Sequence, residues 1–175
     1  MTRDPEAARK VASLHAQVAV AHRTALILVV AFAMSIIVFG GIGFLLLSVR
    51  STVSRVDVPY GFYAAAAALA IGSIVIRRVQ LHRMKLEVVA ATRGIEGLIK
   101  HLVNSTIVAA AIAEGIGMLA LAVAFFGGDK NDVVRLGVVA LAVSLYNYPR
   151  RSAWQRAADY FFATLPGGRE SQLGL

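Results

Sequence analysis

The sequence predicts an all-α polytopic membrane protein with four transmembrane helices and helical cytoplasmic extensions. Hydrophobic residues make up 58% of the 175 residues and charged residues only 16%, which is too apolar for a soluble domain of this size. Several apolar runs approach the length of about 20 residues that a spanning helix needs. Most of the basic residues border these runs, as they do in membrane proteins.

The four spans are expected at about residues 25–49, 60–76, 107–126 and 133–148. The first contains no charged residue. The second is rich in alanine and follows Pro59, which suits the first turn of a helix. The apolar run of the fourth, residues 136–148, is short, and it reaches across a bilayer only if Val133, Val134 and a snorkelling Arg135 extend it.

The remaining segments are expected on the cytoplasmic side: an amphipathic helix at 1–24, a helical segment at 77–104 and an interfacial tail at 149–175. The membrane domain covers 25–148. Apolar residues recur at helical spacing at Val11, Leu14, Val18, Ala21 and Ala25, and again at Leu81, Met84, Val88, Ile95, Leu98 and Leu102. Gly94 and Gly97 are expected to interrupt the second stripe only weakly. The two stripes belong either to a projecting hairpin that continues spans one and two, or to helices lying flat on the headgroups.

The distribution of Lys and Arg predicts the orientation. The amino-terminal segment, the 77–104 segment and the tail carry most of them, so the positive-inside tendency places both termini in the cytoplasm, in a bacterial cytoplasmic (inner) membrane. The net charge of +8 is therefore assigned to contact with anionic lipids and not with nucleic acid. The residues expected at the lipid headgroups are Arg77, Arg78, Arg150, Arg151 and Trp154.

Glu114 is an acidic residue within the third span, about 10 Å from its cytoplasmic end at 1.5 Å per residue. A charge at that depth is costly, so the carboxyl is expected to face other helices and to be mostly protonated unless a polar partner compensates. Candidate hydrogen-bond partners are Ser35, Ser73 and Ser144 on the other three spans. The carboxyl is either an ion-binding site or a clamp between helices.

Small residues in the spans predict close helix packing, because they let backbones approach. The positions expected at helix contacts are Gly40, Gly41, Gly43, Ala110, Ala113, Gly117 and Ala124. The run "GIGFLLLSV" at 41–49 also matches "GIGMLALAV" at 115–123, and spans two and four both end near paired arginines. The chain is thus either two duplicated hairpins or a chance match between apolar runs.

Residues 107–126, with "AIAEGIGMLALAVAFF", resemble the carboxylate-bearing helix of the rotor-ring proteolipids of rotary ATP synthases. The resemblance implies proton or sodium binding at Glu114 and at no other position. It is local, because the carboxylate stands in the third span, the expected termini are cytoplasmic, and the long basic segments have no counterpart in that family.

The sequence offers no pattern typical of an enzyme or a cofactor site. Cysteine is absent, and the spacing of the four histidines matches no paired metal-ligand motif, so neither a metal nor a cofactor is expected. We therefore expect an accessory or scaffold subunit of a larger membrane complex, in contact with lipid and with other membrane subunits or copies of itself. The alternative is a proteolipid-like oligomer that handles protons or sodium through Glu114.

Overall fold

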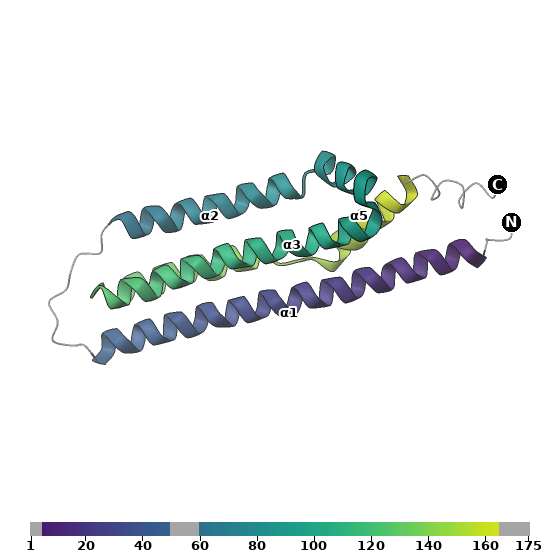
Figure 1. Ribbon diagram of the computed structural model, residues 1–175. Coiled ribbons are helices and arrows are strands. Elements are labelled where there is room, and N and C mark those ends of the chain that lie inside the picture. The colour runs from purple at the N-terminus through teal and green to yellow at the C-terminus, as the bar shows by residue number, and fades with distance from the viewer. Residues whose placement is uncertain (1–4, 50–59, 165–175) are drawn as a thin grey trace. The chain divides into compact units, whose positions relative to one another are not determined.

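A computed structural model describes residues 5–49 and 60–164 (Figure 1), which confirms the all-α prediction. Five helices follow one another over this described part of the chain: α1 (Pro5–Val49), α2 (Tyr60–Gln80), α3 (Arg83–Phe125), α4 (Lys130–Tyr146) and α5 (Arg151–Thr164). Helix α1 ends at Val49 and helix α2 begins at Tyr60, as the sequence predicts.

Three of the described helices contain stretches that are long and apolar enough to cross a membrane, namely Ala12–Val49, Tyr60–Gln80 and Met84–Phe125. Helix α4 has 17 residues. At 1.5 Å per residue it is about 25 Å long, against about 30 Å for the hydrocarbon core of a bilayer. A fourth span therefore stays a prediction.

The chain divides into two compact units. Unit 1 comprises the described residues within Met1–Ile27, Val79–Ser105 and Pro149–Leu175, and unit 2 comprises those within Leu28–Arg78 and Thr106–Tyr148. Helices α1 and α3 each contribute a stretch to both units, whereas α4 belongs to unit 2 and α5 to unit 1.

Unit 2 is a bundle of helical stretches from α1, α2, α3 and α4. Its buried core draws most heavily on α3 and α4 and consists of Ile36, Ala66, Ala113, Ile116, Ala120, Val123, Ala124, Val133, Leu136, Ala140 and Val143. The many alanines keep the helices close, because a short side chain leaves room for the neighbouring backbone.

Unit 1 has its own apolar core, to which three separate stretches of the chain contribute. The buried residues are Leu14, Val18 and Ala25 from α1, Leu86, Ala90, Leu98 and Leu102 from α3, and Trp154 and Ala158 from α5. Helices α1, α3 and α5 are thus held together by side-chain packing within this unit.

The prediction that Gly94 interrupts the 77–104 segment only weakly is wrong. Gly94 has φ 66° and ψ −168°, a backbone conformation that is open essentially to glycine alone, and it breaks α3. The face of the helix therefore changes at this point: Leu98 is buried, whereas Val88 and Met84 are exposed.

The projecting-hairpin alternative paired the 77–104 segment with the second span, and the structure corrects this too. Helix α2 ends at Gln80, and a new helix starts at Arg83 and leads into the third apolar stretch. Residues 83–104 of the segment are therefore the beginning of α3, and residues 77–80 are the end of α2. Helix α1, in contrast, continues its amino-terminal stripe without a break from Pro5 to Val49.

Candidate functional site

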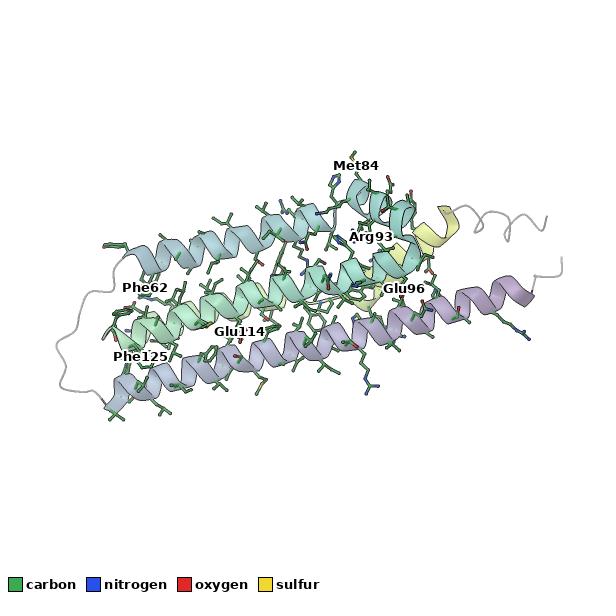
Figure 2. All side chains as sticks on the ribbon, in the orientation of Figure 1. Phe62, Met84, Arg93, Glu96, Glu114 and Phe125 are labelled. Atoms are coloured by element: carbon green, nitrogen blue, oxygen red, sulfur yellow. The ribbon has the colours of Figure 1, made fainter. Side chains whose placement is uncertain are left out.

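The carboxyl of Glu114 lies at the contact between α3 and α1 (Figure 2). Ser35 Oγ donates a hydrogen bond of 2.6 Å to Glu114 Oε1, and both side chains are half-buried. Within the described ranges, this is the hydrogen bond that the structure gives Glu114. The carboxyl group therefore links two helices through one hydroxyl.

Small residues surround this contact and bring α1 and α3 close together. A Cβ added at Gly117 would lie 3.0 Å from Ile36 Cγ1, and one added at Gly43 would lie 3.3 Å from Ala124 Cβ. Both distances are too short for an added methyl group without movement of the neighbours. The structure therefore places Gly43, Gly117 and Ala124 at helix contacts, and it buries Ala110 and Ala113 as well.

Gly40 and Gly41 differ from the other predicted packing residues. A Cβ added at either position would meet nothing within 4 Å. The expectation that these two glycines mediate packing is therefore not met inside the described chain, because the face of α1 that carries them points away from its neighbours.

Ser73 is the second predicted partner of Glu114, but it binds elsewhere. Its Oγ accepts a hydrogen bond of 2.8 Å from Asn147 Nδ2, which also donates to Val143 O at 2.9 Å. Ser73 and Asn147 are both buried, as is Ser144 on α4. These polar groups thus form a cluster that is separate from Glu114. The sequence analysis missed Asn147, although a polar residue at the end of an apolar run was a signal for it.

Arg77 completes this cluster. Its Nη1 donates to Tyr146 O at 2.6 Å and to Asn147 Oδ1 at 3.2 Å, and its Nη2 donates to Tyr148 O at 3.4 Å. The last carbonyls of a helix have no partner within the helix, so the guanidinium satisfies the end of α4. The sequence predicts headgroup contact for Arg77, but in the structure these carbonyls occupy its donors.

Asn147→Leu should lower the free energy of unfolding by about 2 kcal/mol, because it leaves the buried Ser73 hydroxyl and the Arg77 guanidinium without their amide partner. Thermal unfolding of the purified protein in detergent measures this loss. Asn131→Leu is the matched control, since Asn131 is exposed. Equal unfolding temperatures for the two variants would contradict the cluster.

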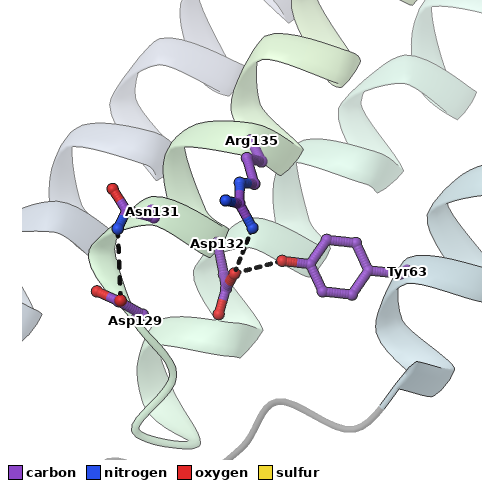
Figure 3. A network of polar contacts seen from close by, with 5 residues as sticks. All are labelled: Tyr63, Asp129, Asn131, Asp132 and Arg135. Carbon is purple, nitrogen blue, oxygen red and sulfur yellow. Dashed lines mark hydrogen bonds and ion pairs between the residues drawn. The ribbon is translucent and has the colours of Figure 1, made fainter.

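A second group of polar contacts lies at the amino-terminal ends of α2 and α4 (Figure 3). The Tyr63 hydroxyl donates to Asp132 Oδ1, and Arg135 Nη1 lies 3.7 Å from the same oxygen. Asn131 Nδ2 donates to Asp129 Oδ2 at 3.4 Å. The Asn131 bond is local to the start of α4, whereas the Tyr63–Asp132 bond links α2 to α4, as the Asn147 cluster does at the other end of the two helices.

Trp154 is a correction to the predicted headgroup contacts. The sequence predicts it at the lipid surface, but its side chain is only 6% exposed and packs in the core of unit 1. Its ring meets that of His22 edge to face at a centroid distance of 5.6 Å. Aromatic residues beside arginines are common at membrane interfaces, so the sequence pattern predicts lipid contact. Only the packing of α5 shows that Trp154 lies in a protein core. Arg78, Arg150 and Arg151 are exposed, as headgroup contact requires.

Three histidines of unit 1 make contacts within the protein. His15 Nε2 lies 2.6 Å from Asp159 Oδ1, His22 Nε2 lies 2.9 Å from Pro149 O, and His101 Nε2 lies 3.1 Å from Gln80 O. No group of three or more metal-ligating side chains converges in the described part of the chain. The contacts of His15 and His22 hold the carboxyl-terminal segment against α1.

No protein-family model, curated protein or solved structure matches this chain. Its function must therefore be argued from its own residues.

Proposed function

We propose that the protein is a four-span integral membrane protein with both termini in the cytoplasm, and that it is an accessory or scaffold subunit of a larger membrane complex. Unit 2 is the part within the bilayer. Unit 1 is a folded cytoplasmic body on which partners assemble.

The shared core of unit 1 supports the four spans. Side chains of α1, of the beginning of α3 and of α5 pack together in it, so these three stretches must lie on the same side of a membrane. The chain crosses through α1 and returns through α2. It leaves again through α3, and it must return through α4 for α5 to reach the same core.

The contacts of α4 explain how 17 residues can serve as a span. A helix that ends inside the bilayer exposes carbonyl groups where there is no water to bind them. Arg77 of α2 donates to the carbonyls of Tyr146 and Tyr148, which are the groups that a longer helix would satisfy itself. The short helix therefore avoids the main penalty of its length.

The hydrogen bond between Glu114 and Ser35 is the main support for a structural role of Glu114. It joins α3 to α1 at a contact where small residues bring the two helices together. A carboxyl that accepts a hydrogen bond from a hydroxyl on another helix is an interhelical clamp, and such a bond needs no second charged side chain.

An ion-handling oligomer is the second candidate. Glu114 is only half-buried, so its carboxyl keeps access to the surroundings of the bundle, as an exchanging proton or sodium ion would require. The resemblance of residues 107–126 to rotor-ring proteolipids favours the same reading.

Substitution of Glu114 separates the two candidates. Glu114→Gln keeps the size and the hydrogen bond but cannot ionise, so a clamp should lose about 1 kcal/mol or less, while Glu114→Ala should lose more through packing. Thermal unfolding in detergent gives the stability. Proton or sodium flux in proteoliposomes that the Gln variant abolishes would establish the ion carrier and contradict the clamp.

Co-purification tests the scaffold role. The tagged protein is extracted from its native membrane in mild detergent, and we expect other membrane subunits to migrate with it in constant proportion. Ser35→Ala is expected to leave that complex weaker but present, because packing remains. Migration of the chain alone, at a concentration where it stays folded, would contradict a scaffold.

A further inference from the structure

The first helical segment of α3, residues 83–93, has apolar residues on two opposite faces. Leu86 and Ala90 are 8% and 2% exposed and belong to the core of unit 1. Met84 and Val88 are 69% and 61% exposed. Residues two apart differ by about 200° around a helix, so the second pair lies opposite the first. We call this second pair, Met84 and Val88, the outer stripe.

The break at Gly94 produces the outer stripe. An unbroken helix would align Met84 and Val88 with Leu98 and Leu102, which are buried. The backbone of Gly94, with φ 66° and ψ −168°, turns the two parts of α3 out of phase. Figure 2 shows Met84 and Glu96 on either side of this break. One apolar face therefore enters the core while the other is left outside it.

We propose that the outer stripe inserts into the headgroup region of an anionic bilayer, so that residues 83–93 form a helix that lies in the plane of the membrane surface. This inference rests on the proposed membrane placement of unit 2. It adds a lipid-binding surface that is separate from the spans and from the arginines at their ends.

Chain continuity identifies the bilayer as the occupant. Helix α2 is long and apolar enough to cross a membrane, and it ends at Gln80. Three residues further on, Arg83 starts the in-plane segment, and an extended chain of that length covers at most about 10 Å. The outer stripe is therefore within reach of the membrane surface at which α2 ends.

The charges around the stripe favour an anionic surface. Residues 83–93 contain the basic residues Arg83, Lys85 and Arg93 and the single acidic residue Glu87. The segment thus joins an exposed apolar stripe to an excess of basic over acidic residues, a pattern of helices that lie in the plane of an anionic membrane.

Site-specific fluorescence tests the proposal, because the native chain has no cysteine and accepts single labels. Met84→Cys, Val88→Cys and the control Glu96→Cys each carry an environment-sensitive fluorophore. The protein is reconstituted in liposomes of phosphatidylcholine with phosphatidylglycerol, or of phosphatidylcholine alone. Iodide quenches labels in water, and a lipid with a spin label near its headgroup quenches labels at the membrane surface.

In the anionic liposomes we expect the spin-labelled lipid to quench the labels at 84 and 88 and iodide to quench them weakly. We expect iodide to quench the label at 96 and the spin-labelled lipid to quench it weakly. Lipid quenching at 84 and 88 should fall in phosphatidylcholine alone. Equal iodide quenching at 84 and 96 would overturn the proposal, and so would shielding of the 84 label from both quenchers, which would mean that protein covers it. Equal lipid quenching in the two liposomes would overturn the preference for an anionic surface.

A further label at Val38→Cys separates this inference from the proposed membrane placement. Val38 is an exposed residue of the first apolar stretch, so a lipid spin-labelled deep in its acyl chain should quench it. No quenching there would contradict the membrane placement itself. Quenching at 38 without lipid quenching at 84 would overturn the in-plane helix alone.

Discussion

Trp154→Ala is expected to lower the free energy of unfolding of unit 1 by about 3–5 kcal/mol, the largest effect of any substitution considered. The indole is 6% exposed, joins α5 to the core formed with α1 and α3, and meets the His22 ring edge to face. Its removal leaves a cavity that rigid helices cannot refill. Tryptic cleavage within α5 in detergent should therefore accelerate by at least about a hundredfold, since each 1.4 kcal/mol is a factor of ten.

Two variants control this measurement. Trp154→Phe keeps an aromatic ring in the core and should lose much less stability. Ser152→Ala changes an exposed position on the same helix and should cleave at the wild-type rate. If the Ala variant at 154 also cleaves at that rate, then α5 does not pack on α1 and α3.

Gly117→Leu should destabilise the contact between α1 and α3 in unit 2 by about 3 kcal/mol or more, at the upper end of the usual cost of overpacking. A Cβ alone would already lie 3.0 Å from Ile36 Cγ1 and 3.4 Å from Ile36 Cα, and the backbone atom cannot move aside without moving α1. The larger side chain should also separate Ser35 from Glu114. Thermal unfolding in detergent measures the loss.

Gly41→Leu is the matched control, because it makes the same change in a helix of the same unit where a Cβ meets nothing within 4 Å. It should unfold close to the wild-type temperature. A Gly117 variant as stable as the Gly41 variant would show that α1 and α3 are not packed at this point.

The sequence predicts the helices well, because apolar content and helical period are local properties of the chain. Three apolar stretches and the gap between Val49 and Tyr60 follow directly from the residues. The break at Gly94 does not, because a glycine inside a helix is compatible with either backbone conformation. Leu86 and Leu98, on either side of Gly94, both pack into the core of unit 1, and this tertiary contact is not visible in the sequence.

The candidate site was predictable only in part for a related reason. The position of Glu114 within an apolar run predicts that its carboxyl faces other helices and gives three candidate serines as partners, but it does not give the rotation or register of one helix against another. The structure selects Ser35. For Arg77 and Trp154, the position at the end of an apolar run is compatible with lipid or protein contact, and only tertiary packing decides between them.

Accessibility of single cysteines on the two sides of the membrane tests the central claim most directly, namely that α4 returns the chain across the bilayer to the side of unit 1. Asn131→Cys precedes most of α4, and Ser152→Cys follows it in α5. In intact cells that express these variants, a membrane-impermeant maleimide should label position 131 at once and position 152 only after permeabilisation. Labelling of both positions from the same side would contradict the fourth span.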